Sequence, residues 1–284
     1  MTTTEFLDVP GARLHYEIRG SGPLLLVLGS PMAAADFALL ADEMAADYTV
    51  VTYDPRGVAG STLADIEQDS TPELRAADVL AIMDAVGADT ADVFGSSGGA
   101  VTGLALVEQQ PGRVRTLVAH EPPLLDLLPD AARRHAEVDD MIDTFRREGA
   151  EPAWRKFMIS AGFDVPEGVD GAPEGAAGPP PDESVDQEAA SARFFCHELR
   201  STTRFLPDVP RLIAGPARVV VGIGADSGGL TTYPTSTALA DMLGAPPLTF
   251  PGDHGGFLTE PAAFAQVLGQ ALAPSLSAVG NSAR

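Results

Sequence analysis

A serine flanked by glycines is the residue of this sequence best suited to covalent chemistry. Ser97 is the central residue of Gly-Ser-Ser-Gly-Gly at positions 95–99, a G-x-S-x-G pattern. Glycines two residues before and two after it permit a turn too tight for side chains, and a helix beginning there favours negative charge beside the hydroxyl. Ser96 fits less well because the glycines are symmetric about Ser97. The alternative is a turn without chemical function. We predict Ser97 as a nucleophile, which requires a histidine as general base.

The segments around Ser97 predict a strand before it and a helix after it. Residues 91–94 form a short apolar run, and residues 98–110 are small and apolar at helical spacing. The same alternation continues along the chain, which predicts an α/β fold with helices on both faces of a sheet. Further strands are expected at 13–18, 24–28, 48–53, 114–119, 218–221 and 247–250, and further helices at 36–46, 72–87, 235–243 and from 261 onward.

This rhythm stops between residues 122 and 210. Helical, charged segments there surround a stretch rich in proline, glycine and acidic residues at about 164–188, whose composition predicts a flexible loop. A chain of 284 residues is long enough to bury one enlarged core. We therefore expect one α/β core from residues 1–121 and 211–284, with residues 122–210 inserted into it.

Two motifs show that the chain resembles the α/β-hydrolase superfamily over nearly its whole length. Residues 95–99 match the nucleophile turn of that family, and residues 54–61 are similar to its D-x-R-G-x-G-x-S turn, with Ala59 at the second glycine position. The most similar branch contains proline iminopeptidases, cofactor-free haloperoxidases and small esterases. The resemblance implies a mostly parallel, eight-stranded sheet and a helical cap at 122–210. Haloalkane dehalogenases and epoxide hydrolases use aspartate where this chain has Ser97.

Five histidines are candidates for the general base. The order of the family, nucleophile then acid then histidine, selects His254, which follows the last expected strand in a glycine-rich loop. His15 falls within an early strand, and His135 and His197 lie in the insertion, so structural or exposed positions are expected for them. His120 adjoins a strand end and is a candidate for the pocket wall.

Two carboxylates are candidates for the acid that orients His254. Asp226 follows the strand at 218–221, close to where the family usually supplies the acid, and Glu121 follows the strand at 114–119. Either one is able to accept the Nδ1–H of the imidazole. We prefer Asp226, because an acid after the strand that follows the nucleophile helix often has a structural function. Glu121 stays the alternative.

Acyl transfer also requires N–H donors for the oxyanion that forms on the substrate. The backbone N–H of Gly98, directly after the nucleophile, is one candidate. The second is the N–H of Ser30 in the turn after the strand at 24–28, since Pro31 has no N–H to donate. The alternative is that this turn has only a structural role. Leu28 occupies a position where many members of the family have histidine.

Composition excludes several classes of function. A net charge of −22 repels nucleic acids and anionic lipids, so neither is expected as a partner. No apolar run reaches the roughly 18 residues of a membrane span, and the first residues lack a secretory signal, so a cytoplasmic location is expected. Cys196 is the only cysteine, which excludes an internal disulfide. No histidine–carboxylate cluster has metal-ligand spacing and no dinucleotide motif follows a strand, so no metal or cofactor is expected.

These patterns together predict a serine hydrolase that cleaves a small-molecule carboxylic ester, lactone or thioester through an acyl-enzyme. One alternative is a lyase or carbon–carbon bond hydrolase that uses the same three residues. Another is a ligand-binding member of the family without turnover. The sequence leaves open whether the chain forms a homo-oligomer.

Overall fold

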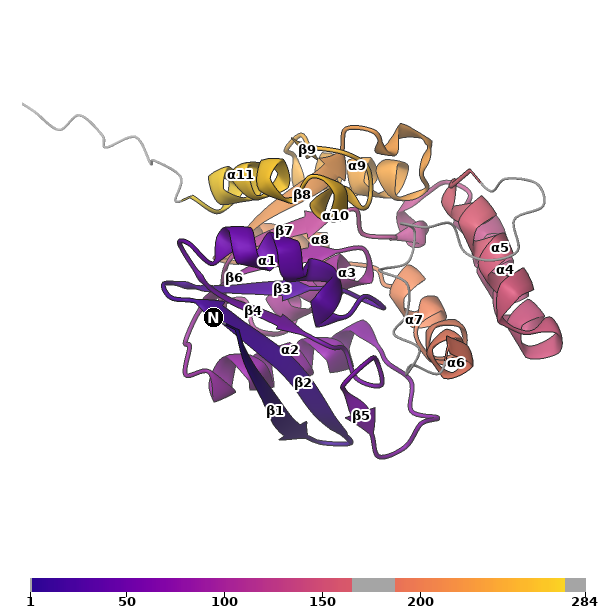
Figure 1. Cartoon of the computed structure of the whole chain (residues 1–284). Helices are drawn as coiled ribbons and strands as arrows, with labels where there is room; N and C mark the ends of the chain where they lie inside the picture. Colours follow the sequence, from indigo (N-terminus) through magenta and orange to yellow (C-terminus); the bar gives the residue numbers. More distant parts are fainter. Residues whose placement is uncertain (1, 165–186, 274–284) are drawn as a thin grey trace, which may run out of the picture.

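The computed structural model describes residues 2–164 and 187–273, in which helices cover both faces of one sheet (Figure 1). This confirms the predicted α/β architecture. Residues 165–186 of the segment predicted to be flexible lie outside the described residues.

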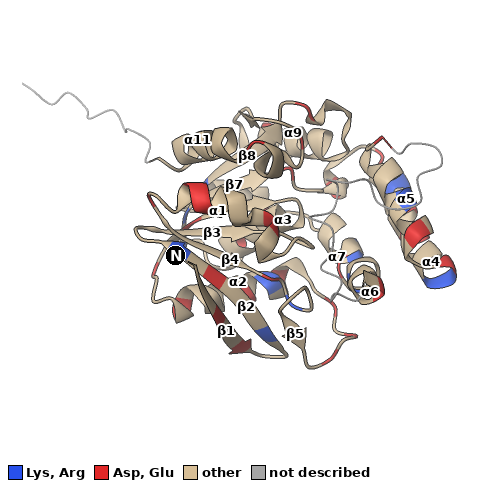
Figure 2. Cartoon of the chain, viewed as in Figure 1, with Lys and Arg blue, Asp and Glu red and all other residues tan. Residues whose placement is uncertain are grey.

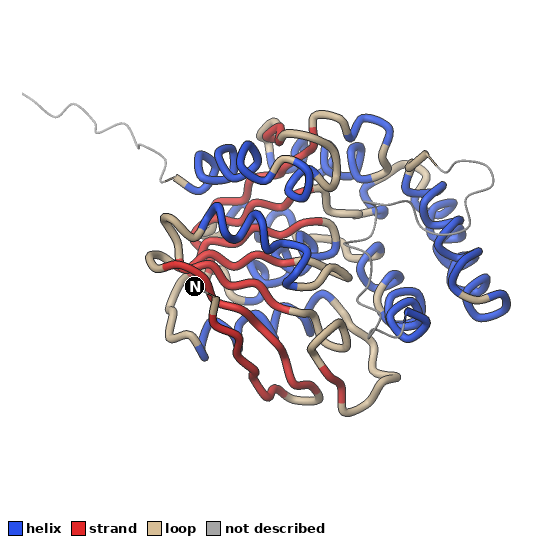
Figure 3. Tube along the Cα trace, viewed as in Figure 1, coloured by secondary structure: helices blue, strands red, loops and turns tan. Residues whose placement is uncertain are grey.

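The sheet is mostly parallel, as predicted, and Figure 3 shows its strands side by side. Among the described residues, eight strands follow one another in the order β1-β2-β4-β3-β6-β7-β8-β9, and the short strand β5 pairs with β2. The pairings of β2 with β1 and β4 are antiparallel, and every pairing from β4 to β9 is parallel. The strands are β1 (Thr3–Val9), β2 (Ala12–Gly20), β3 (Leu24–Leu28), β4 (Thr49–Tyr53), β5 (Thr62–Leu63), β6 (Ala91–Ser96), β7 (Val114–His120), β8 (Arg218–Gly224) and β9 (Leu248–Phe250).

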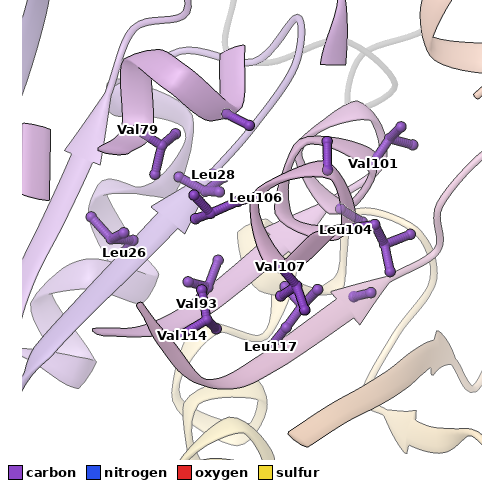
Figure 4. Close-up of a cluster of buried hydrophobic side chains, with 14 of the residues drawn as sticks. Leu26, Leu28, Val79, Val93, Val101, Leu104, Leu106, Val107, Val114 and Leu117 are labelled. Atoms are coloured by element: carbon purple, nitrogen blue, oxygen red, sulfur yellow. The ribbon is translucent and has the colours of Figure 1, made fainter. Parts of the chain in front are cut away.

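Two hydrophobic clusters fix the helices to the two faces of the sheet. Alternate residues of β3 point to opposite faces: Leu26 and Leu28 join the cluster shown in Figure 4, and Leu25 and Val27 join the other. On the face of Leu26 pack α2 (Pro72–Ala85), α3 (Gly98–Gln109), α8 (Val209–Ala214) and α9 (Thr232–Leu243). On the face of Leu25 pack η1 (Ala34–Phe37), α1 (Ala38–Met44), α10 (Gly256–Thr259) and α11 (Pro261–Leu272).

Of the helices inserted between β7 and β8, those before α8 form a third hydrophobic cluster. They gather at one end of the sheet (Figure 1), and we call α4 to α7 the cap. The cluster includes stacked aromatic rings, with Trp154 on Phe194 at 4.9 Å between ring centroids. The inserted elements before α8 are η2 (Leu125–Leu127), α4 (Ala131–Glu148), α5 (Ala150–Ala161), α6 (Gln187–His197) and α7 (Leu199–Thr203).

Acidic residues lie on more than one part of the molecule. Figure 2 shows acidic residues on both the sheet and the cap, in line with 40 Asp and Glu against 18 Lys and Arg in the chain. Within the described ranges, no helix is both long and apolar enough to cross a lipid bilayer.

Among the elements that the sequence patterns missed are β1, β5 and α10, which are short or exposed. β1 lies at the end of the strand order and most of its residues are exposed, so it lacks the apolar alternation of a half-buried strand. β5 and α10 have two and four residues, too few to show a period. The helix expected at 36–46 is divided between η1 and α1.

The turn after β4 is joined by hydrogen bonds to η1 and to α2. The carboxylate of Asp54 accepts hydrogen bonds from the Ala34 N–H at 2.8 Å and the Gly60 N–H at 2.9 Å. Two residues further on, the guanidinium of Arg56 donates two hydrogen bonds to the carboxylate of Asp78 on α2. Arg56 and Asp78 are 1% and 2% exposed. This buried ion pair therefore fixes α2 to the turn.

Asp78→Ala leaves the guanidinium of Arg56 buried without a counter-charge. We expect the free energy of unfolding, measured by urea denaturation, to fall by about 3–5 kcal/mol. Arg133→Ala is the matched control, because it removes an ion pair with Glu137 that lies at the surface of α4, and we expect it to cost much less. Equal losses in the two variants would contradict the importance of the buried pair.

Candidate active site

Ser97 lies at the junction between β6 and α3 with a strained backbone. Its φ is 56° and its ψ is −123°, a conformation that residues other than glycine rarely adopt. Its N–H donates a hydrogen bond of 2.9 Å to the carbonyl oxygen of His120 on the neighbouring strand. Strain of this kind persists only where the surrounding structure enforces it, and it is concentrated at functional sites.

The glycines around Ser97 are required by close backbone contacts. A Cβ on Gly95 would lie 2.4 Å from the carbonyl oxygen of Gly99, and a Cβ on Gly99 would lie 2.0 Å from the carbonyl oxygen of Leu28. Neither distance is compatible with a side chain. The glycines thus allow the turn to close and let the end of β3 pack directly against the start of α3.

His254 lies in the loop between β9 and α10 and is oriented by Glu121. Its Nδ1 is 2.6 Å from Glu121 Oε2, and its side chain is 20% exposed. Ser97 and His254 line the same cavity. No hydrogen bond joins the Ser97 hydroxyl to the imidazole in the part of the chain that the structure describes. Such bonds are often long in enzymes without substrate and shorten in the complex.

Glu121 is fully buried, and its carboxylate has three hydrogen-bond partners. Besides His254, it accepts hydrogen bonds from the N–H of Gly224 at 2.8 Å and the hydroxyl of Thr232 at 2.7 Å. Burial alone would raise the pKa of Glu121, but the hydrogen bond and the charge of His254 lower it to about 2. Glu121 itself has a φ of 50°, a second strained residue beside Ser97.

The preference for Asp226 as the partner of His254 requires correction, because Glu121 occupies that position. The side chain of Asp226 is exposed, and its N–H donates to the carbonyl oxygen of Gly252 at 2.9 Å. The physical reason is the strand order. β7 is the direct neighbour of β6, with His120 paired to Ser96, so Glu121 follows β7 where Ser97 follows β6. Asp226 lies beyond β8, one strand further away.

The two backbone donors named from the sequence are adjacent in space. An ideal Cβ on Gly98 would lie 2.7 Å from the carbonyl oxygen and 3.1 Å from the Oγ of Ser30. In the described residues, neither the Ser30 N–H nor the Gly98 N–H donates to a protein acceptor. Both residues also line the cavity that contains Ser97. The two N–H groups are therefore available to a ligand.

The other histidines have partners away from the cavity. His120 is fully buried, its Nδ1 is 3.2 Å from Ser96 Oγ, and burial lowers its pKa to about 4. It lies behind His254, with 6.2 Å between the ring centroids, rather than in the pocket wall. His15 contacts Asp54 at 2.8 Å.

The cavity is formed jointly by the core and the cap, and most of its wall is apolar. Its volume is about 150 Å³. The cap contributes aromatic and aliphatic side chains, and Glu198, between α6 and α7, is the charged residue that the cap places in the wall. Burial raises the pKa of Glu198, which is 2% exposed. The apolar residues of the wall are Pro31, Met32, Pro123, Leu125, Val138, Met141, Trp154, Phe157, Ala161, Phe163, Phe194, Leu199 and Leu230.

Sequence reasoning did not identify Glu198. It follows an apolar run in a charged, helical segment, and no motif marks it. The unusual feature of Glu198 is its burial, and burial becomes visible only once the packing is known. Among residues 2–164 and 187–273, no three His, Cys, Asp or Glu side chains come together as metal ligands.

Known proteins are similar to this chain in sequence and in fold. A family model described as "Alpha/beta hydrolase family" matches residues 24–267. The uncharacterized hydrolase YraK of Bacillus subtilis (strain 168) is 31% identical over 267 residues, which cover 88% of this chain and 89% of YraK.

Two solved structures extend the comparison to the fold. The enol-lactonase from Burkholderia xenovorans LB400 has a TM-score of 0.62 at 19% identity, covering 94% of this chain and 99% of its own. A thermophilic esterase from Thermogutta terrifontis has a TM-score of 0.70 at 15% identity, covering 95% and 97%. At these identities the similarity shows a common fold.

The lowered pKa of Glu121 predicts a pH-dependent contribution to stability. The folded-state pKa of about 2 lies below the ordinary value of 4.5, so the ionised carboxylate stabilises the fold above about pH 4.5, and this stabilisation decreases as the pH falls toward 2. We expect the difference in free energy of unfolding between the wild type and Glu121→Gln to shrink by about 2 kcal/mol between about pH 5 and pH 3.

Urea denaturation at a series of pH values measures this difference. Ser97→Ala is the control, because it leaves the contact between Glu121 and His254 in place and should follow the wild type. A difference between the wild type and Glu121→Gln that is independent of pH would contradict the prediction.

Proposed function

The chain belongs to the α/β-hydrolase family, and from this premise we propose that it is a serine hydrolase that cleaves a carboxylic ester, lactone or thioester through an acyl-enzyme. The observation that carries the proposal is the contact of the buried Glu121 with His254, which lines the same cavity as the strained Ser97. This is the set of side chains that acyl transfer to a serine requires.

In the proposed first step, His254 accepts the hydroxyl proton of Ser97 while the serine oxygen attacks the carbonyl carbon. Glu121 holds the imidazole by its Nδ1–H and stabilises the imidazolium that forms. The N–H groups of Ser30 and Gly98 bind the oxyanion. The imidazolium then protonates the leaving alcohol or thiol, which departs as the acyl-enzyme forms.

In the second step, a water molecule attacks the acyl carbonyl. His254 accepts a proton from this water and returns it to the oxygen of Ser97 as the acid product leaves. The same two N–H groups bind the second oxyanion. Ser97 and His254 are the two residues of the protein that change their protonation state in these steps.

The cavity supports substrates with a small apolar group. Its wall is mostly apolar, and its volume of about 150 Å³ is similar to that of an apolar protein cavity that binds benzene. Apolar pockets with a few polar groups at one end are typical of sites for small molecules. An esterase and an enol-lactonase share the fold, which also favours ester and lactone substrates.

We expect the wild type to hydrolyse p-nitrophenyl esters of short acyl chains and to lose kcat/KM as the chain grows beyond about six carbons, because the cavity is small. Ser97→Ala should be inactive against the whole series. Release of p-nitrophenol measures both.

The alternative activity is tested separately. Product analysis after incubation with a substrate whose carbon–carbon bond could be cleaved distinguishes ester hydrolysis from lyase activity.

A fluorophosphonate probe supplies the control for this experiment, because it reacts with an activated serine whatever the natural acyl group is. The wild type should be labelled and Ser97→Ala should not. Equal labelling of both would overturn the assignment of the nucleophile, and tight binding of small molecules without hydrolysis or labelling would indicate a non-catalytic protein.

The acid is tested by comparing Glu121→Gln with Asp226→Asn. Glutamine cannot stabilise the imidazolium as a carboxylate does, so we expect kcat to fall by about 10³ to 10⁴ in Glu121→Gln. Asp226→Asn, a matched change at an exposed carboxylate, should keep kcat within about threefold of the wild type. Steady-state kinetics with p-nitrophenyl butanoate measures both, and a larger loss in Asp226→Asn would restore Asp226 as the acid.

A further inference from the structure

A buried glutamate of the cap contacts the loop that supplies one of the proposed oxyanion donors. Glu198 lies between α6 and α7, and its Oε1 accepts a hydrogen bond from the Oγ of Ser30. Ser30 is in the loop after β3, some 168 positions earlier in the chain. Both residues are 2% exposed. The hydrogen bond therefore joins the cap to the core inside the cavity.

This glutamate is an unfavourable choice for packing alone. Its Oε2 is buried and has no hydrogen-bond partner among the described residues. The nearest counter-charge is Arg75 of α2, whose Nη1 is 3.9 Å from Oε1. A carboxyl group in such surroundings costs free energy that an apolar residue of similar size would not. A buried, incompletely satisfied polar group calls for a functional reason.

The contacts of Ser30 supply that reason. Its carbonyl oxygen and Oγ lie against Gly98, at 2.7 Å and 3.1 Å from the position of an ideal Cβ there. A small shift of Ser30 would therefore change the separation of the N–H groups of Ser30 and Gly98, two residues that line the cavity. Oxyanion stabilisation depends on donors held at 2.7–3.1 Å from the developing charge, so this separation matters for the rate.

We propose that Glu198 is a positioning residue, which holds the Ser30 loop through the serine hydroxyl and so lets the cap set the geometry of the oxyanion site. The inference rests on the proposed function, since it assigns Glu198 a part in the same reaction. Glu198 does not touch the reacting atoms in this scheme, and its effect passes through Ser30.

Two variants each remove one partner of the hydrogen bond between Ser30 and Glu198. Glu198→Ala removes the acceptor, and Ser30→Ala removes the hydroxyl but keeps the backbone N–H. We expect each to lower kcat on p-nitrophenyl butanoate by about 10- to 100-fold, less than the loss of a whole oxyanion donor, with KM within about threefold. The double variant should lose no more than either single variant, because both act on one contact.

A rescue variant and a matched control separate positioning from stability. Glu198→Gln keeps an acceptor for the Ser30 hydroxyl and should keep kcat within about threefold of the wild type. Asp69→Ala removes another contact between the cap and the core, from Asp69 Oδ1 to His197 Nδ1 at 3.0 Å, outside the cavity wall. It should leave kcat unchanged whatever it does to the melting temperature.

A second readout follows the oxyanion site directly. An alkylboronic acid forms a tetrahedral adduct on the nucleophilic serine, and its oxygen occupies the place of the oxyanion. Its inhibition constant should rise in Glu198→Ala and Ser30→Ala by about the factor by which kcat falls, and should stay unchanged in Asp69→Ala. A loss that came only from a loosened fold would not follow this order.

The outcomes distinguish this inference from the proposed function. If the wild type neither hydrolyses esters nor reacts with fluorophosphonate, the proposed function fails. If the wild type is active and Ser30→Ala has the wild-type kcat, or if Glu198→Gln loses as much as Glu198→Ala, the positioning role is overturned. Should Glu198→Ala fail to fold, Ser30→Ala and Glu198→Gln carry the test.

Discussion

The site depends on the parallel pairing of β6 with β7. This register places Ser96 opposite His120, so the residues that follow, Ser97 and Glu121, leave two neighbouring strands at the same edge of the sheet. Both have a positive φ, which turns each chain sharply away from its strand. His254 then needs only to approach from the loop after β9 to meet the carboxylate. Two strained turns and one hydrogen bond thus bring the three side chains of the site together.

Local patterns predicted the parts of this site that local structure determines. The glycines around Ser97 and the loop position of His254 depend on a few adjacent residues, and the expected strands and helices around them agree with the structure. Local patterns could not identify the acid that orients His254, because the choice between Glu121 and Asp226 depends on which strand lies beside β6. Strand order is a property of the packed sheet and leaves no period in the sequence. Glu198 escaped notice for the same reason, since its contact with Ser30 exists only after the cap has folded.

The cap and the sheet bury separate sets of apolar side chains. The two clusters of the sheet contain the interiors of β3, β6 and β7, whereas the cap cluster consists mostly of aromatic and aliphatic residues from α4 to α7. The cavity lies between them and takes its wall from both. Changes in cap residues therefore alter the shape of the cavity without opening the core of the sheet. The turn at Asp54 and the buried pair of Arg56 and Asp78 secure the core side of this boundary.

The position of Trp154, stacked on Phe194, makes its fluorescence sensitive to the contents of the cavity. Trp154 is the only tryptophan of the chain, it lines the cavity, and its indole N–H donates to the hydroxyl of Ser191 at 3.0 Å. Ultraviolet excitation at the red edge of protein absorption therefore samples a single chromophore. Its emission wavelength depends on the polarity around the ring. A ligand that displaces water from the cavity therefore shifts the emission spectrum, and no attached dye is needed.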